Sequence, residues 1–511
     1  MLEIETERKK LQEHLDSLKS QRERNVMGQF STPYPLAEDI MRYLKSLVGT
    51  EETSLFEPSI GTGVFYSAFA DTFGIGSKAL GIEIDSHYYA PSSDLWRNYP
   101  LEIRHEDFFT ARPDRQFPLI VANPPYVRHH HIGKELKQRL QALSLQRTGV
   151  IMSGLSGLYC YFLILSEVWL QPGGISCWLI PSEFMDVNYG KALKQYLLEN
   201  VDLIRIHRFQ ADDLQFSDAL VSSCVVVFRK AEPNRETEIV FSLGGSLCKP
   251  TRSKHIKRDE IHAAQKWTGL FDDEFQEEMC TDILGNYFTV KRGIVTGGND
   301  FFIVDQSTID KYGIDKLFLR PILPSPRYIS GNVVEEVKGG MPDTEQQCFL
   351  FSCNLQENIL KKSYPGTWEY ICHGISQGVP KGYVCSRRTP WYSCEDRLPA
   401  SIVVPYMGRS DTGNRMFRFI LNKSKALTTN VYLLLYPKPQ YEKLLSDQDV
   451  LLQVWKALNT IPPDRIARGG RFYGGGLRKM EPNELMNIPA GELNNLLRGP
   501  SYGVQLSISG V

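Results

Sequence analysis

Between about residues 28 and 230, short apolar segments alternate with stretches of helical periodicity. The apolar segments have the length of buried strands, and the helical stretches between them have the length of crossover connections. This alternation predicts a parallel or mixed α/β sheet with helices on both faces. The predicted strands are Leu55-Phe56, Ala79 to Ile84, Leu119 to Ala122, Ile175 to Ile180 and Ser223 to Phe228.

The pattern divides the chain into three parts. Residues 1–27 are highly charged, with Ile4, Leu11, Leu15 and Leu18 at helical spacing, so we expect an amphipathic helix with a structural role. Residues 28–240 carry the α/β alternation. In residues 241–511 the regularity is lost among short strands, glycines, prolines and aromatic residues, which indicates a second domain whose fold the pattern leaves open.

Composition excludes several classes of protein. The chain has 511 residues, of which 42% are hydrophobic and 23% charged, as in ordinary soluble proteins of two or three domains. The longest apolar stretch, Tyr159 to Leu170, is shorter than the roughly 20 residues that span a bilayer, and no signal peptide follows Met1. Ten scattered cysteines without a Cys-x-x-Cys pair argue against a zinc ribbon or a disulfide framework. We therefore expect a protein of the reducing cytoplasm with no membrane partner.

Charge is balanced over the whole chain but not along it. The formal net charge of −1 argues against wholesale electrostatic binding of nucleic acid. The segment between Lys456 and Lys479, however, contains six basic residues and only one acidic residue, Asp464. Glycines and aromatic residues lie among them. That mixture suits close approach to a phosphate backbone or a base, although a solvated glycine-rich loop would look similar. The candidate nucleic-acid contacts are Arg468, Arg471, Tyr473, Arg478 and Lys479.

The tetrapeptide Asn123-Pro124-Pro125-Tyr126 follows a predicted strand directly. The side-chain amide of Asn123 and the backbone carbonyl of Pro124 both offer acceptors, so together they can hold the two N–H groups of a planar amine. The two prolines stiffen the turn, and Tyr126 offers a face on which a base can stack. This combination indicates alkylation at an amino nitrogen. A Pro-Pro turn taken alone, however, more often has only the structural role of ending a strand.

Three further motifs come at the ends of earlier predicted strands. Gly61 and Gly63, after the acidic Glu57, would let the backbone approach a ligand, although the spacing fits neither the dinucleotide fingerprint nor a P-loop. Glu83 ends the second strand, where a carboxylate can accept from both hydroxyls of a ribose. Asp107 and the neighbouring Phe108 lie where a further strand, between Ile84 and Leu119, should end, and there they can contact the amino group and the face of an adenine. Each motif alone is common in structural roles, but together they converge on one crevice.

This order of motifs resembles the S-adenosylmethionine-dependent amino methyltransferases. It is most similar to the γ group of DNA adenine-N6 methyltransferases from type II restriction–modification systems, in which the cofactor motifs precede the catalytic turn and the target-recognition domain comes last. The likeness covers most of the chain. It implies a Rossmann-like S-adenosylmethionine-binding catalytic domain over residues 28–240 and a mixed α+β DNA target-recognition domain over residues 241–511.

The resemblance also implies roles for individual residues. Thr32, in Gly28-Gln29-Phe30-Ser31-Thr32-Pro33, matches the segment that holds the methionine end of the cofactor, and Phe216 resembles the aromatic residue on the second face of the extruded base. The segment from Gly470 to Pro482 resembles the closing signature of enzymes like those of the PstI and HincII systems, and residues 291–299 and 388–392 resemble parts of their recognition domain. Catalysis would then involve Asn123, Pro124, Tyr126 and Phe216, and S-adenosyl-L-methionine would be held by Thr32, Glu57, Gly61, Gly63, Glu83, Asp107 and Phe108.

The expected enzyme methylates N6 of a flipped-out adenine in a short sequence of double-stranded DNA, as a monomer in a prokaryotic cytoplasm. It needs no metal, so we interpret His129-His130-His131 as loop residues near the DNA rather than as ligands. Amino methyltransferases of the same fold that act on cytosine N4, RNA or a glutamine amide remain alternatives, as do a bifunctional restriction enzyme and a non-catalytic DNA-binding module. The sequence does not reveal the target site.

Overall fold

The computed structural model describes residues 3–48, 53–209, 222–271, 282–409, 417–472 and 477–497. These residues form two compact units. Residues 3–271 belong to the first unit, and residues 282–409, 417–471 and 477–497 belong to the second.

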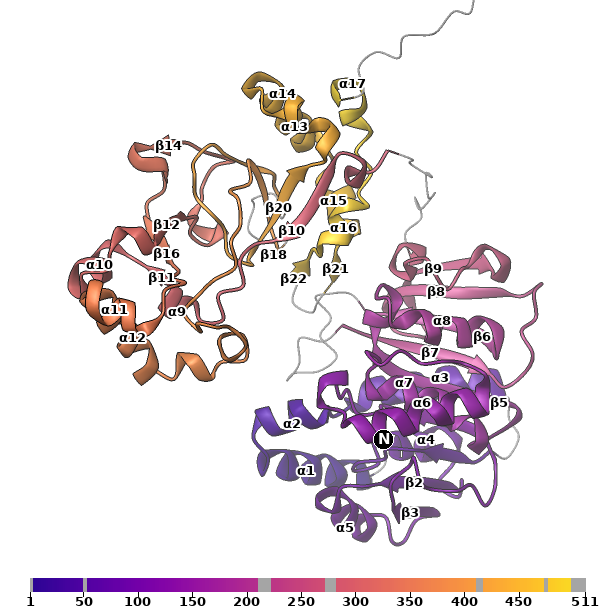
Figure 1. The fold of residues 1–511 in the computed structure, drawn as a ribbon. Helices are drawn as coiled ribbons and strands as arrows, with labels where there is room; N and C mark the ends of the chain where they lie inside the picture. The colour runs from indigo at the N-terminus through magenta and orange to yellow at the C-terminus, as the bar shows by residue number, and fades with distance from the viewer. Residues whose placement is uncertain are drawn as a thin grey trace, which may run out of the picture. The chain divides into compact units, whose positions relative to one another are not determined.

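One nine-stranded sheet organises the first unit (Figure 1). Its strands are β1 (Leu55–Glu57), β2 (Ala79–Glu83), β3 (Leu101–His105), β4 (Phe117–Ala122), β5 (Leu170–Pro181), β6 (Asp202–Arg208), β7 (Ser223–Arg229), β8 (Glu238–Gly245) and β9 (Pro250–Lys257). Their spatial order is β3-β2-β1-β4-β5-β7-β6-β8-β9. The first five strands of the chain run parallel, whereas β7 is antiparallel to both of its neighbours. Because β2 and β4 flank β1, the order reverses there, and a crevice forms at the carboxyl ends of these strands.

Helices cover both faces of this sheet because its central strands are apolar on both sides. Leu55, Leu119 and Val121 pack with α3 and α4, whereas the alternate residues Phe56 and Ile120 pack with α7 on the other face. The helices of this unit are α1 (Glu3–Ser17), α2 (Gln21–Met27), α3 (Tyr34–Val48), α4 (Val64–Phe73), α5 (Ser86–Leu95), α6 (Lys134–Thr148), α7 (Leu158–Leu165) and α8 (Gly190–Glu199).

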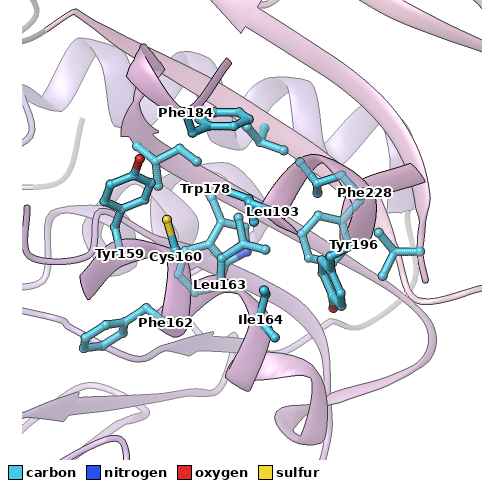
Figure 2. Close-up of a cluster of buried hydrophobic side chains, with 14 of the residues drawn as sticks. Tyr159, Cys160, Phe162, Leu163, Ile164, Trp178, Phe184, Leu193, Tyr196 and Phe228 are labelled. Carbon is cyan, nitrogen blue, oxygen red and sulfur yellow. The ribbon is translucent and has the colours of Figure 1, made fainter. Parts of the chain in front are cut away.

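Trp178 of β5 lies at the centre of the core on the α7 side (Figure 2). Cys160 and Leu163 of α7 and Leu193 and Tyr196 of α8 surround its indole. The indole N–H donates to Ser176 Oγ at 2.6 Å, so this large side chain is fully buried with its polar atom satisfied. The packing fixes α7 against the strands that lead to the crevice.

The predicted Rossmann-like fold is confirmed, and the structure differs from the expectation in one boundary and in the number of N-terminal helices. The charged N-terminal segment forms two helices, because Ser20 caps a new helix at Gln21 through a capping box with Glu23. The first unit continues beyond residue 240, because β8 pairs with β6 and β9 pairs with β8 in the same sheet. Both strands therefore lie in the unit that carries the crevice.

The second unit mixes small sheets with short helices. Its main sheet has the order β10 (Phe288–Arg292), β20 (Tyr432–Pro437), β17 (Ile402–Pro405), β19 (Ile420–Asn422) and β13 (Val333–Val334). The smaller sheets are β11 (Ile303–Val304), β16 (Cys348–Phe351) and β12 (Leu319–Ile322); β14 (Glu336–Val337) and β15 (Met341–Pro342); and β18 (Met407–Arg409), β22 (Leu477–Lys479) and β21 (Arg471–Phe472). This is the mixed α+β organisation that the resemblance implied.

Separate apolar clusters support the two larger sheets of this unit. Helix α14 packs with the five-stranded sheet, and α12 packs with the three-stranded sheet of β11, β16 and β12. The helices are α9 (Asn299–Phe302), α10 (Gln306–Tyr312), α11 (Glu357–Ser363), α12 (Pro365–Ser376), α13 (Pro439–Leu445), α14 (Gln448–Thr460), α15 (Pro463–Gly469), α16 (Pro482–Met486) and α17 (Asn494–Leu497). Of the helices in the described ranges, none is both long enough and apolar enough to cross a membrane.

Candidate functional site

A cavity of about 480 Å³ lies at the carboxyl ends of β1, β2, β3 and β4. Its volume falls in the range of pockets that hold small ligands and cofactors. The residues predicted from four separate motifs meet here. The cavity is lined by Thr32, Glu57, Gly61, Glu83, Asp107, Phe108 and Asn123, together with neighbours that include Gln12, Asp16, Thr62, Phe109, Pro125, His131 and Phe162.

The turn after β1 depends on two glycines with positive φ angles. Gly63 has φ +83°, and a Cβ added there would lie 2.7 Å from Nε1 of Trp96, whose indole N–H donates to the Thr62 carbonyl at 2.9 Å. Gly61 has φ +55°, and nothing would lie within 4 Å of a Cβ at that position. Gly63 is therefore needed for packing against Trp96, whereas Gly61 leaves open space beside the cavity.

Glu57 ends β1 with a carboxyl group that is almost completely buried, at 3% exposure. Its Oε2 has no hydrogen-bond partner among the described residues. Burial, and then the negative charge of Glu83, raise its pKa well above the ordinary value, while Arg8 acts in the opposite direction. A cationic group in the cavity would favour the ionised form of this carboxyl group.

Glu83 ends β2, and its two carboxylate oxygens accept from different backbone amides. Oε2 accepts from Gly61 N at 2.9 Å, and Oε1 accepts from Asp85 N at 2.8 Å. Burial raises its pKa despite these two bonds. Each carboxylate oxygen retains capacity for another donor, such as a ribose hydroxyl.

Asp107 and Phe108 follow β3 and form a polar and an aromatic part of the cavity wall. Asp107 Oδ1 accepts from Phe109 N at 3.0 Å, and Oδ2 lies 3.7 Å from Nη2 of Arg139. The Phe108 ring stacks on Phe162 with centroids 4.8 Å apart and planes inclined by 13°. A carboxylate acceptor thus lies next to a rigid aromatic surface.

Asn123 has a side-chain amide whose orientation is fixed by its neighbours. Its Nδ2 donates to the Phe30 carbonyl at 2.9 Å and to Thr32 Oγ1 at 3.0 Å. A backbone carbonyl can only accept, so the amide nitrogen must face Phe30. The amide oxygen Oδ1 is consequently directed elsewhere; it is buried and has no partner in the described part of the chain. Thr32 meanwhile accepts from Asn123, which leaves its hydroxyl hydrogen for another acceptor.

Of the remaining catalytic candidates, Pro124 and Tyr126 are buried beside the cavity. Pro124 is buried, and Tyr126 is only 8% exposed, with its hydroxyl donating to the Leu179 carbonyl at 3.1 Å. The Tyr126 ring packs against Phe30 at 5.5 Å between centroids, and burial raises its pKa well above the ordinary value. Phe216 lies outside the described residues. In this structure, the Tyr126 ring is thus part of the apolar packing beside the cavity.

Sequence reasoning missed the contribution of α1 to the cavity wall. Gln12 and Asp16 lie one helical turn apart and both line the cavity. The signal available in the sequence was this pair of polar residues on one helix face, but similar pairs occur on many solvent-exposed helices. His131, in the short 3₁₀ turn His129–His131, also lines the cavity.

Four of the five DNA-contact candidates lie in described elements near the C-terminal end of the chain. Arg468 lies in α15, Arg471 in β21, and Arg478 and Lys479 in β22, whereas Tyr473 lies outside the described residues. The Lys479 ammonium lies 2.9 Å from Glu481 Oε1, which partly compensates its charge.

Two segments of the second unit that resembled recognition-domain parts contact each other. The guanidinium group of Arg388 donates to the carbonyls of Thr296, at 2.7 Å, and Val295. Gly297 has φ +85°, and a Cβ there would lie 2.8 Å from Val384 Cβ. The structure thus brings residues 291–299 and 388–392 together. Within the ranges that the structure describes, no group of three or more His, Cys, Asp or Glu side chains could hold a metal ion.

Comparisons with known proteins agree with this architecture. Residues 81–216 match the family described as Eco57I restriction-modification methylase, and residues 269–500 match the C-terminal domain of type II methyltransferase M.Eco57I. The type II methyltransferase M.AccI of Acinetobacter calcoaceticus is 26% identical over 489 residues, covering 90% of this chain and 85% of the relative. M.XamI of Xanthomonas campestris pv. amaranthicola is 26% identical over 491 residues, covering 92% and 86%.

A solved structure extends the comparison of folds to nearly the whole chain. The type IIL restriction-modification enzyme MmeI, solved in complex with DNA, has a TM-score of 0.56 at 11% identity, covering 95% of this chain and 78% of MmeI. Fold and family together identify a DNA methyltransferase that uses S-adenosyl-L-methionine as methyl donor. The chain belongs to the type II restriction–modification methylases.

Proposed function

We propose that this methylase transfers the methyl group to N6 of an adenine flipped out of a short duplex DNA sequence, and so protects host DNA in a type II restriction–modification system. The observation that carries the proposal is the orientation of the Asn123 amide. Its nitrogen is held by Phe30 and Thr32, and its oxygen is a buried acceptor with no partner among the described residues.

A buried acceptor without a partner costs about 1–3 kcal/mol, so the arrangement favours a ligand that supplies the missing donor. The exocyclic amino group of adenine has two N–H donors. Asn123 Oδ1 accepts one of them, and the Pro124 carbonyl accepts the other. Two acceptors on one nitrogen draw it towards tetrahedral geometry and localise its lone pair for attack. Positioning of the amino group is therefore the main catalytic contribution of this turn.

The cavity residues fit the methyl donor in size and chemistry. When bound, S-adenosyl-L-methionine supplies an electrophilic methyl group on a positively charged sulfur. Thr32 would donate to its carboxylate, Glu57 would compensate its positive charge, and Gly61 and Gly63 would allow the backbone to lie close to it. Glu83 would accept from the ribose hydroxyls, and Asp107 and Phe108 would contact the adenine ring.

DNA contacts complete the proposal. Phe216 stacks on one face of the extruded base, and Tyr126 stacks on the other once its ring exchanges its packing against Phe30 for the base. Arg468, Arg471, Tyr473, Arg478 and Lys479 contact the duplex. The enzyme acts as a monomer, because one adenine is modified in each event, and it works in a prokaryotic cytoplasm without a metal.

Substitution of Asn123 tests the proposal. Asn123→Ala should abolish transfer of labelled methyl groups to DNA, while binding of S-adenosyl-L-methionine measured by calorimetry persists. Retained cofactor binding is the control for folding of the cavity. Near wild-type turnover by the Asn123→Ala protein would contradict the assignment.

A further inference from the structure

Helix α1 buries two charged side chains in the first unit in addition to apolar ones. Its buried residues are Glu5, Arg8 and Leu15, with Glu5 at 2% and Arg8 at 4% exposure. Charged side chains are rarely buried to this extent unless they are paired. A buried ion pair is weak evidence for stability, because desolvation offsets most of the attraction. The pair therefore calls for a more specific role than attachment of the helix.

That role is indicated by the third contact of Arg8. The guanidinium group binds both carboxylate oxygens of Glu5 at 2.7 Å, which fixes its plane. Its Nη1 then donates to Thr62 Oγ1 at 2.8 Å, and the Thr62 hydroxyl donates to Gln12 Oε1 at 2.5 Å. Thr62 is the residue between the two glycines of the turn after β1. The Thr62 hydroxyl both accepts from α1 and donates to α1.

The same network continues to the other parts of the cavity wall. Gln12 Nε2 donates to Asp16 Oδ1 at 2.8 Å. Asp16 Oδ1 also accepts from the Tyr88 hydroxyl at 2.8 Å, and Oδ2 accepts from Ser31 Oγ at 2.7 Å. Helix α1 thus joins the turn after β1, α5 after β2, and the segment before α3. These are three of the segments that line the cavity.

We propose that α1 is a clamp on the cofactor site, in which Arg8 and Gln12 are positioning residues that hold Thr62 and the glycine turn in the geometry that binds S-adenosyl-L-methionine. The inference rests on the proposed placement of the cofactor in this cavity. Its consequence is linkage: because docking of α1 favours cofactor binding, the cofactor must stabilise the docked helix by the same factor. A helix with a purely structural role would show no such coupling.

Thr62 offers a sharper substitution than Arg8, because removal of Arg8 would leave the Glu5 carboxylate buried and unpaired. Thr62→Val keeps the shape of the side chain but removes both contacts with α1, whereas Thr62→Ser keeps the hydroxyl. Thr148→Val is a matched control, because the Thr148 hydroxyl also donates a hydrogen bond, to the Ser144 carbonyl at 2.8 Å, but outside the cavity lining.

Affinity for S-adenosyl-L-methionine is measured by calorimetry, and docking of α1 by the rate of trypsin cleavage at Lys9 and Lys10, with and without cofactor. We expect Thr62→Val to weaken cofactor binding at least about tenfold, the equivalent of about 1.4 kcal/mol. It should also lose the protection of Lys9 and Lys10 by the cofactor. Thr62→Ser and Thr148→Val should retain both properties.

The outcomes separate the clamp from the proposed cofactor site. Equal affinity and equal protection in the wild-type and Thr62→Val proteins would overturn the clamp alone. Failure of the wild-type protein to bind S-adenosyl-L-methionine would overturn the proposed function and the clamp with it.

Discussion

Substitution of Gly28 by alanine should disrupt the turn Asn123-Pro124-Pro125-Tyr126, for which we propose a catalytic role, from a position outside it. Gly28 ends α2 with φ +66°, and its carbonyl accepts from Tyr126 N at 2.9 Å. A Cβ on Gly28 would lie 2.3 Å from Tyr126 N and 2.6 Å from Val127 N. These contacts are with backbone atoms, so a side-chain rotation cannot relieve them. The segment before α3 must move away from the turn, and with it Phe30 and Thr32, the partners of Asn123.

The expected destabilisation has two contributions, and the expected loss of activity follows from the displacement of Asn123. The left-handed conformation costs a residue other than glycine about 1–2 kcal/mol. Loss of the hydrogen bond to Tyr126 adds about 1 kcal/mol, so the total destabilisation is about 2–3 kcal/mol. Displacement of Asn123 by about 1 Å would lower methyl transfer by about 10²-fold.

Gly149→Ala is the matched control, because Gly149 ends α6 with φ +72° but has nothing within 4 Å of an added Cβ. It should show only the conformational cost and retain methyl transfer. Urea unfolding and single-turnover transfer of labelled methyl groups to DNA measure the two effects. If Gly28→Ala proved as stable and as active as Gly149→Ala, the argument that this glycine holds the catalytic turn would be refuted.

Three more predictions concern single contributions. Thr32→Val removes one acceptor of the Asn123 amide and should lower single-turnover methyl transfer about fivefold, since a hydrogen bond contributes about 1 kcal/mol; an unchanged rate would exclude this role. The pKa of Glu57 is raised by burial and by a neighbouring carboxylate, so its stabilising effect is complete below its pKa in the unfolded chain and is lost as pH rises towards its pKa in the folded state. Glu57→Gln should therefore stabilise the cofactor-free protein against urea more at pH 8 than at pH 5. A stability difference that does not change with pH would show that the pKa of Glu57 is not raised in the folded protein. Arg468→Ala with Arg471→Ala should weaken DNA binding and reduce the slope of log affinity against log salt by up to about 2, since each phosphate contact contributes about 0.9; an unchanged slope measured by fluorescence anisotropy would remove both residues from the interface.

Several central strands of the nine-stranded sheet could be predicted from the sequence, because each is a short apolar run followed by turn residues. Leu55-Phe56 and Leu119 to Ala122 are short apolar runs followed by turn residues, and both form central strands. Because parallel strands bring their carboxyl ends to one edge, the order of motifs was sufficient to predict that Glu83 and Asn123 would share a cavity. This part of the site depends on topology more than on side-chain detail.

Contacts between distant segments could not be read in the same way. The buried pair of Glu5 and Arg8 looks like surface charge until Thr62 supplies the third partner, 54 residues further along the chain from Arg8. β9 was missed because its sequence, from Pro250 to Lys257, is mostly polar and has only Ile256 buried. An edge strand of this kind is held by backbone pairing, which leaves little apolar pattern. The strands of the second unit's smaller sheets are also short, so the apolar pattern of each one is too brief to predict a strand from the sequence.

The central claim is methylation of an adenine amino group. The most direct measurement is transfer of labelled methyl groups from S-adenosyl-L-methionine to unmethylated plasmid DNA without magnesium, followed by separation of the nucleosides and sequencing of the modified positions. We predict N6-methyladenine at one short motif as the labelled product. Label in N4-methylcytosine, or no label in DNA, would contradict the claim and direct the search to cytosine or to RNA.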